Sequence, residues 1–200
     1  STGKVRVIVY SATQKAFTGT SGAVVEISLK AGTLPGANTI SLSNVVMSNE
    51  AGASLTATTV NGTITVNGPR AEVTTTQIDY GRVANGTTGS ATITVYNRGN
   101  QAFNITSATC GNTHFTVSAT LPATVAANSS KTLTVNFNNA AGDFDMATEL
   151  TIATSDPVLE RSVFKVPLKA VAYSLNTITI GTVSGKAGAE IRVPVNISNQ

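Results

Sequence analysis

The 200-residue sequence has very little that could perform chemistry. It contains one cysteine, Cys110, and one histidine, His114, so it cannot form an intrachain disulfide. The two residues are close enough in sequence for a Cys–His dyad, but neither a glycine-rich elbow nor an oxyanion motif accompanies them. A half-buried structural thiol beside a loop is therefore the favoured interpretation. We expect no enzyme activity and assign no catalytic residue.

Aromatic and charged residues are also scarce. Aromatic residues make up 5% of the sequence, with no tryptophan, and charged residues make up 12%. Carbohydrate sites usually present aromatic platforms, and no two of the four tyrosines lie close in sequence. The net charge of +3 is small and the basic residues are scattered, whereas a nucleic-acid surface needs clustered basic and stacking residues. The composition argues against a nucleic-acid partner and weighs against a sugar site.

Acidic residues are too isolated to form an obvious metal or catalytic pair. Asp143 and Asp145 flank Phe144, and paired acids in a loop can hold calcium. No third or fourth acidic residue lies nearby, so a solvated turn is favoured, and no carboxylate pair suggests glycoside hydrolysis. We predict no metal and no cofactor.

Long apolar runs are absent as well. No stretch approaches the length of a transmembrane helix, and the residues after Ser1 do not form a signal peptide. We therefore expect no membrane span and interpret the chain as a mature or excised segment. Its richness in threonine, serine, asparagine, glycine, alanine and valine is typical of extracellular bacterial β modules. This composition predicts an extracellular location on the bacterial cell surface.

The sequence is rich in short segments where polar and apolar residues alternate, above all between residues 77 and 173. Such alternation, with turn residues at regular spacing, predicts an antiparallel sandwich that buries one face of each sheet. The expected strands are 77–83, 90–96, 102–106, 114–118, 131–137, 149–154 and 161–172. Residues 120–125 are expected to cross between the sheets. The predicted fold class is all-β.

Three motifs of this stretch follow a familiar order. Tyr80-Gly81-Arg82-Val83 ends a strand, the strand at 93–96 runs into Asn97-Arg98-Gly99-Asn100, and Ser155-Asp156-Pro157 turns before the final strand. This order resembles the ASH (ASPM–SPD-2–Hydin) domains, also known as choice-of-anchor D domains in bacteria. The resemblance implies an immunoglobulin-like sandwich over residues 73–173 that serves as a structural or interaction module without an active site.

The first segment, residues 1–68, also alternates. We expect strands at 4–10, 22–30, 38–46, 55–60 and 63–66, with Asn61-Gly62 as a hairpin turn. The residues 7–11, 17–22 and 40–46 resemble the second half of a cohesin-type module, a jelly-roll-like sandwich that binds dockerin partners. The resemblance implies that residues 1–68 are the C-terminal part of a cohesin-like β-sandwich.

The last segment, residues 174–200, resembles the opening strands of the same kind of module. Residues 177–188 end in the turn Gly185-Lys186-Ala187-Gly188, and residues 190–198 contain the strand Val193-Pro194-Val195. Pro194 has no N–H donor, so it fits an edge or a bulge. The sequence therefore carries the end of a cohesin-like module first and the start of one last.

Two interpretations of this order remain open. The chain is either a window from an array of alternating modules, or residues 177–198 complete the open sandwich of residues 1–68. A central sandwich of seven strands has its two ends at opposite poles, which favours completion by another copy. Strand addition of this kind makes a head-to-tail filament. The candidate strand-exchange residues are Ile178, Ile180, Val183, Ile191, Val193, Val195 and Ile197.

The sequence as a whole predicts a non-catalytic, extracellular structural or adhesion module of a bacterial surface protein or filament. Its partners are other copies of itself or neighbouring modules. The alternative is a module that binds a protein or a glycan, such as a cohesin–dockerin scaffold. A pull-down from host lysate separates the two.

Overall fold

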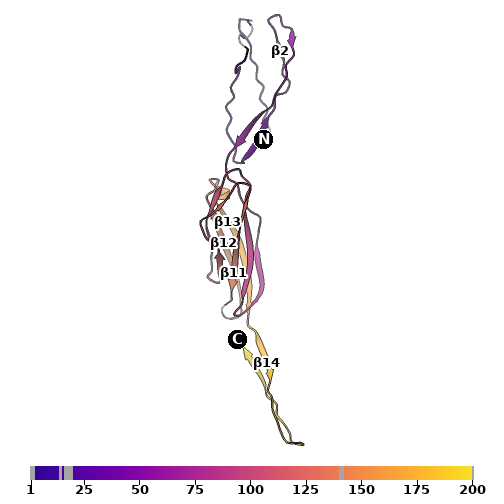
Figure 1. Ribbon diagram of the computed structural model, residues 1–200, viewed down its shortest axis with the longest axis vertical. Coiled ribbons are helices and arrows are strands. Elements are labelled where there is room, and N and C mark those ends of the chain that lie inside the picture. Colours follow the sequence, from indigo (N-terminus) through magenta and orange to yellow (C-terminus); the bar gives the residue numbers. More distant parts are fainter. Residues whose placement is uncertain (1–2, 14, 16–19, 140–141, 200) are drawn as a thin grey trace. The chain divides into compact units, whose positions relative to one another are not determined.

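The computed structural model describes residues 3–13, 15, 20–139 and 142–199. Within these ranges the chain forms fifteen β-strands and one short 3-10 helix, η1 (Leu159–Arg161), so the predicted all-β class is confirmed. The chain divides into two units, Ser1–Val66 and Asn67–Gln200 (Figure 1).

The second unit contains a sandwich of two sheets. A five-stranded sheet has the order β10-β8-β12-β13-β6, and a four-stranded sheet has the order β5-β7-β11-β9. The strands are β5 (Ala71–Val73), β6 (Ile78–Ala84), β7 (Thr88–Asn97), β8 (Phe103–Cys110), β9 (Phe115–Ser118), β10 (Ala123–Val125), β11 (Ser130–Asn138), β12 (Phe144–Thr154) and β13 (Val163–Tyr173). The crossing expected near residue 120 lies between β9 and β10, which belong to different sheets.

The core of this sandwich lies between the two sheets. The predicted alternation in β11 is confirmed, because Leu133, Val135 and Phe137 are each fully buried. Three further rings pack on Phe137: Phe115 at 4.8 Å, Tyr80 at 6.0 Å and His114 at 6.3 Å between ring centroids. Each buried aliphatic or aromatic side chain contributes about 1.5–3 kcal/mol. The other fully buried large apolar side chains are Ile93, Ile105, Leu150, Ile152, Leu168, Val95, Val125 and Val166.

The chain reaches and leaves the sandwich at opposite poles. The carbonyl of Gly68 accepts hydrogen bonds from Asn100 N (3.1 Å) and Gln101 N (3.3 Å), just beyond the C-terminal end of β7. The carbonyl of Tyr173 accepts one from Asn85 N (2.9 Å), just before the N-terminal end of β7. Because a ten-residue strand such as β7 spans roughly 30 Å, the two poles are far apart. The sandwich has nine strands among the described residues, not the expected seven.

One pairing contradicts the expected antiparallel arrangement. β6 lies parallel to β13, with Ile78 opposite Leu168 and Ala84 opposite Tyr173. The reason is that the chain crosses from one sheet to the other between β5 and β6 without reversing. β6 therefore runs toward the same pole as the last strand, β13. The register shifts within this pair, where Gly81 adopts a φ of 62°.

The first unit has far less regular structure than the alternation predicted. β1 (Gly36–Ile40) pairs with β4 (Gly62–Val66), and β2 (Met47–Ser48) pairs with β3 (Ser54–Leu55). The strands predicted at 4–10 and 22–30 are wrong for the described residues, which form no ladder there. A strand needs a neighbour for its backbone groups, and the described residues of this unit do not supply one. The predicted segment around Phe17 lies outside the described residues.

The predicted Asn61-Gly62 hairpin is also wrong. Gly62 opens β4, and β4 pairs with β1 instead of with residues 55–60. Of the expected 38–46 strand, only the first residues belong to β1. No described residue of this unit is buried. The unit therefore has alternating strand sequences without a core.

The last part of the chain forms a hairpin. β14 (Asn176–Ile180) pairs antiparallel with β15 (Val195–Asn199), and Gly181 N donates to Pro194 O at 2.8 Å just beyond them. The predicted turn is confirmed, because Ala189 N donates to Lys186 O and Gly188 has a φ of 82°. The strand predicted from residue 190 begins only at Val195. Across the described ranges, no helix has the length and apolar character needed to cross a membrane.

Candidate functional site

The hairpin of β14 and β15 has one apolar face and one polar face. The register places Ile178 opposite Ile197 and Ile180 opposite Val195, so these four side chains share one face. The other face carries Thr177, Thr179, Asn196 and Ser198. All four apolar side chains are exposed: Ile178 by 67%, Ile197 by 69%, Ile180 by 73% and Val195 by 63%.

The remaining candidate strand-exchange residues are exposed too. Val183, Ile191 and Val193 lie between β14 and β15 and are 40–48% exposed. Ile191 packs against Gly185. A Cβ added to Gly185 would lie 2.9 Å from the Cγ1 atom of Ile191. Contiguous exposed apolar surface of this kind is a feature that many protein interaction sites share.

The first unit presents a similar two-faced sheet. In the β1–β4 pair, Ile40, Ile64 and Val66 share one face, and threonines dominate the other. Ile40 is 41% exposed, and Ile64 and Val66 are half-buried. Further exposed apolar residues of this unit are Val5, Val7, Ile8, Val9, Tyr10, Val24, Val25, Ile27, Leu29, Leu34, Leu42, Val45, Val46, Met47, Leu55 and Val60.

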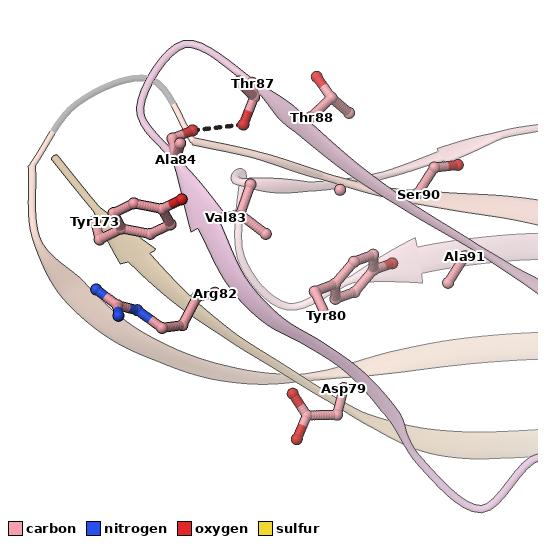
Figure 2. A pocket seen from close by; sticks show the side chains of 11 residues that line it. Asp79, Tyr80, Arg82, Val83, Ala84, Thr87, Thr88, Ser90, Ala91 and Tyr173 are labelled. Carbon is pink, nitrogen blue, oxygen red and sulfur yellow. Dashed lines mark hydrogen bonds between the residues drawn. The ribbon is translucent and has the colours of Figure 1, made fainter. Parts of the chain in front are cut away.

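An open groove of about 500 Å³ lies between β6 and β7 (Figure 2). It exists because β5 covers β7 only at 95–97 and the chain then crosses to the other sheet. Its charged side chains already have partners: Asp79 pairs with Lys169 at 3.2 Å, and Arg82 lies over the Tyr173 ring at 4.5 Å. The hydrogen bond from Gly81 N and the contact with Lys169 lower the pKa of Asp79.

Tyr80 lines this groove but reaches into the sandwich. Its hydroxyl donates to Val135 O at 2.8 Å, and burial, followed by the nearby Cys110, raises the pKa of Tyr80 to about 12. The phenol therefore stays protonated at neutral pH. Tyr80 therefore does not supply the groove with an ionised nucleophile at neutral pH.

The structure does not bring Cys110 and His114 together as a dyad. Cys110 is half-buried against the core, and burial raises the pKa of its thiol. His114 Nδ1 instead lies 3.0 Å from Asn138 O, and its ring packs on Phe144 at 5.2 Å. A raised pKa disfavours the thiolate, which is the nucleophilic form. These contacts agree with the structural reading of Cys110.

Asp143 is exposed and also contacts the chain that leaves the sandwich. Its Oδ1 accepts a hydrogen bond from Ser174 N, directly after β13. Among the residues that the structure describes, no group of three or more His, Cys, Asp or Glu side chains could hold a metal ion. Asp143 and Asp145 are both exposed, in agreement with the predicted solvated segment, and Asp143 in addition contacts the outgoing chain.

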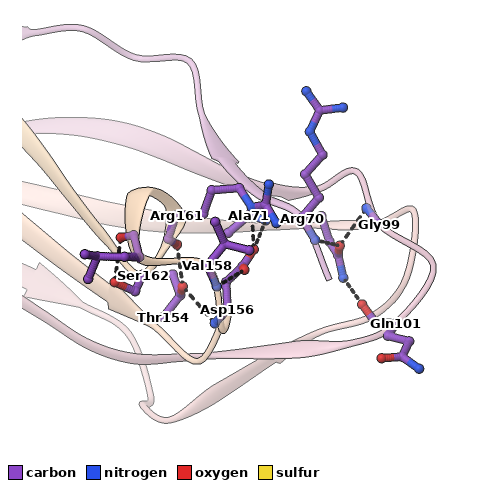
Figure 3. Close-up of polar contacts among 11 residues, drawn as sticks. Arg70, Ala71, Gly99, Gln101, Thr154, Asp156, Val158, Arg161 and Ser162 are labelled. Atoms are coloured by element: carbon purple, nitrogen blue, oxygen red, sulfur yellow. Dashed lines mark hydrogen bonds and ion pairs between the residues drawn. The ribbon is translucent and has the colours of Figure 1, made fainter. Parts of the chain in front are cut away.

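Asp156 is a polar residue of the sandwich that is only 3% exposed and whose side chain accepts three hydrogen bonds (Figure 3). Its Oδ2 accepts from Ala71 N and from Arg161 Nε, each at 2.9 Å, and its Oδ1 accepts from Val158 N at 2.9 Å. Burial opposes ionisation, but the bonds from Ala71, Val158 and Arg161 together outweigh it and lower the pKa of Asp156. The carboxylate therefore fastens β5 to the turn before η1.

Asn97 fastens the incoming chain at the same pole. It is 1% exposed, and its Oδ1 accepts from Arg70 N (3.2 Å) and Gly99 N (2.9 Å). Its Nδ2 donates to Gln101 O and Val125 O. A Cβ on Gly99 would lie 2.4 Å from Gly68 O, so glycine is required there. The Asn97-Arg98-Gly99-Asn100 and Ser155-Asp156-Pro157 motifs thus hold residues 68–71, a role that sequence reasoning did not predict.

This sandwich, with its two motifs and mixed pairing, defines an immunoglobulin-like module. Residues 69–163 match the family model described as "Abnormal spindle-like microcephaly-assoc'd, ASPM-SPD-2-Hydin" (ASH). The central segment therefore matches the ASH family model, in agreement with the resemblance of its motifs. None of the curated protein sequences matches the chain.

Several solved structures are similar to the chain. The ASH/PapD-like domain of human CEP192 is 10% identical with a TM-score of 0.46, covering 58% of this chain and 94% of that one. A protein of unknown function from Porphyromonas gingivalis W83 is 18% identical with a TM-score of 0.44, covering 72% and 69%. WR4, an MSP family member of C. elegans, is 14% identical with a TM-score of 0.37, covering 52% and 97%.

Proposed function

We propose that the chain is a non-catalytic structural module of an extracellular bacterial surface protein or filament, and that copies join head to tail. In this proposal the β14–β15 hairpin of one copy completes the first unit of the next. The observation that carries the proposal is the exposed apolar face formed by Ile178, Ile180, Val195 and Ile197.

The first unit has what such a hairpin requires of a receptor. Its described residues include alternating segments at 4–10 and 22–30 that have no strand partner and no buried side chain. Added strands would supply backbone hydrogen bonds, and their alternate side chains would supply a core. The resemblance of the two segments to the end and the start of a cohesin-type module supports the same match.

The free energy of such a joint is sufficient only if backbone pairing accompanies side-chain burial. Burying the four side chains of the hairpin face contributes about 6–12 kcal/mol at about 1.5–3 kcal/mol each. Association costs about 4–15 kcal/mol. The remaining exchange residues and the new ladder must therefore contribute as well, which favours strand completion over simple face-to-face contact.

Joining between copies is favoured over completion within one chain. Residues 68–71 are hydrogen bonded at one pole of the sandwich, and Tyr173 and Ser174 are bonded at the other. Such head-to-tail contacts do not close, so they generate a filament. The extracellular location is supported by the composition, which is low in charge and rich in threonine, serine and asparagine.

The test compares the intact chain with an apolar-face double variant, Ile178→Asn with Ile197→Asn. A matched control, Thr179→Asn, changes the opposite face of the same hairpin. Sedimentation and electron microscopy are recorded over a range of concentrations. We expect a ladder of oligomers or fibres from the intact chain and the control, and at least about a hundredfold weaker association of the double variant.

Two results would overturn the proposal. One is assembly of a chain truncated before Ser174 to the same extent as the intact chain. The other is a monomer at every concentration for all variants, which would favour the alternative of a module that binds a different protein or a glycan.

A further inference from the structure

The second strand of the sandwich, β6, and its last strand, β13, lie side by side and run in the same direction. β6 pairs with β13 over five registered positions, from Ile78 opposite Leu168 to Ala84 opposite Tyr173. The chain reaches β6 from the pole where Gly68 is bonded and leaves β13 at the opposite pole. Tension along the chain therefore pulls β6 by its N-terminal end and β13 by its C-terminal end.

This geometry makes the β6–β13 ladder resist tension in shear. Two parallel strands that are pulled from opposite ends must slide past each other along their length. The hydrogen bonds between them then stretch together, so the ladder fails only when several bonds break at once. If the same strands were pulled from one common end, the bonds would break one after another.

Side-chain contacts reinforce both ends of this ladder. Near its start, Lys169 Nζ lies 3.2 Å from Asp79 Oδ2. Near its end, the guanidinium of Arg82 lies 4.5 Å from the centre of the Tyr173 ring (Figure 2). Just beyond it, Asn85 Nδ2 donates to Ser174 Oγ at 2.8 Å.

A second, shorter fastening precedes β6. β5 has three residues and pairs antiparallel with the end of β7. Ala71 N donates to the buried Asp156 carboxylate, and Glu72 pairs with Arg98 at 2.8 Å. Tension on the incoming chain reaches this fastening before it reaches β6.

We infer that the ASH sandwich is a tension-resisting module with two steps: β5 detaches first, and the β6–β13 ladder then holds until it fails in shear. Detachment of β5 releases residues 71–77, about 25 Å of extended chain. The inference rests on the proposed head-to-tail assembly for the source of the tension. The mechanical resistance itself belongs to a single chain.

Single-molecule force spectroscopy of the whole chain tests this inference. In the shear arm, handles are attached through peptide tags before Ser1 and after Gln200. In the matched arm, the first handle is moved to position 87 through Thr87→Cys, at the pole where β13 ends. Both arms carry Cys110→Ala so that only the intended thiol reacts, and circular dichroism verifies that each variant is folded. The C-terminal hairpin lies in the force path of both arms, so its contribution to the extension is the same in each.

We expect a short extension step followed by a rupture in the shear arm. The rupture force should exceed that of the matched arm by about twofold or more, because the ladder bonds fail together in one arm and in sequence in the other. Arg82→Gln should lower the shear force and leave the force of the matched arm less affected.

Equal rupture forces in the two arms, or a lower force in the shear arm, would overturn the inference. Because the measurement uses one molecule at a time, it does not depend on assembly. A strong shear response from a chain that never associates would refute the head-to-tail proposal alone, and a weak response from a chain that forms fibres would refute the mechanical inference alone.

Discussion

Asp156 is the residue whose replacement should most weaken the sandwich without changing its volume. In Asp156→Asn, the amide can still accept hydrogen bonds through one oxygen, but its NH₂ group faces N–H donors, and Arg161 loses its carboxylate partner. The carboxylate is buried and the Arg161 side chain is 15% exposed. Removing one member of such a pair costs about 2–4 kcal/mol. In a domain of this size we expect the Tm to fall by roughly 10–20 °C.

Thermal and urea unfolding, followed by far-ultraviolet circular dichroism and by tyrosine fluorescence, measure this loss. Glu72→Gln is the matched control at the same pole, because its ion pair with Arg98 is solvent-exposed and contributes at most about 1 kcal/mol. A stability of Asp156→Asn within about 0.5 kcal/mol of the parent would refute the view that this carboxylate holds β5.

The same residue predicts a pH dependence. The pKa of Asp156 is lowered from its ordinary value of 3.8 by folding. A group with a lowered folded-state pKa contributes stability that is fully present above its unfolded-state pKa and is lost as the pH falls through the folded-state pKa. The parent should therefore lose stability below about pH 4, and Asp156→Asn should lose less over the same range. Parallel curves for the two proteins would contradict the assignment.

Three further predictions concern other positions of the chain. Gly99→Ala should destabilise the sandwich by about 2 kcal/mol or more, because its Cβ would lie 2.4 Å from a backbone oxygen; Gly22→Ala, with open space around it, is the control, and urea melts compare them. Cys110 should react with a thiol reagent much more slowly in the folded chain than in urea, since burial raises its pKa; equal rates would contradict its position. Tyr80→Phe should cost about 1 kcal/mol and remove the phenol that ionises near pH 12, as absorbance at high pH would reveal.

The central sandwich was the most predictable part of the molecule. Its alternating segments have neighbouring strands to pair with and an opposing sheet that buries their apolar side chains, and alternation alone guarantees neither. The segments predicted at 131–137 and 161–172 became β11 and β13, each with a neighbour on both sides. β5 was missed because three residues are too few to reveal alternation. Its position depends on Asp156, 85 positions away, and that separation has no local signal in the sequence.

The polar network at the incoming pole was visible in the sequence only as motifs. The resemblance identified Asn97 and Asp156 as parts of recurring segments but gave no reason for them. The structure supplies the reason. Asn97 accepts a hydrogen bond from the backbone N–H of Arg70, and Asp156 accepts one from the backbone N–H of Ala71. Each side chain thus satisfies a backbone donor that would otherwise need another partner. A motif residue that is polar and lies beside a strand end is therefore a candidate for such a fastening.

The strand predictions for the segments on either side of the sandwich were partly wrong, and the reason bears on function. Alternation reports which side chains gain free energy from burial, and it does not report whether a neighbouring strand is present. Residues 4–10 and 22–30 have the alternation without the neighbour, and β14 and β15 have the neighbour but an uncovered face. Each segment lacks what the other could provide. Exposed apolar faces promote aggregation unless another surface covers them. In the proposed assembly, these two incomplete structures are the two halves of one joint.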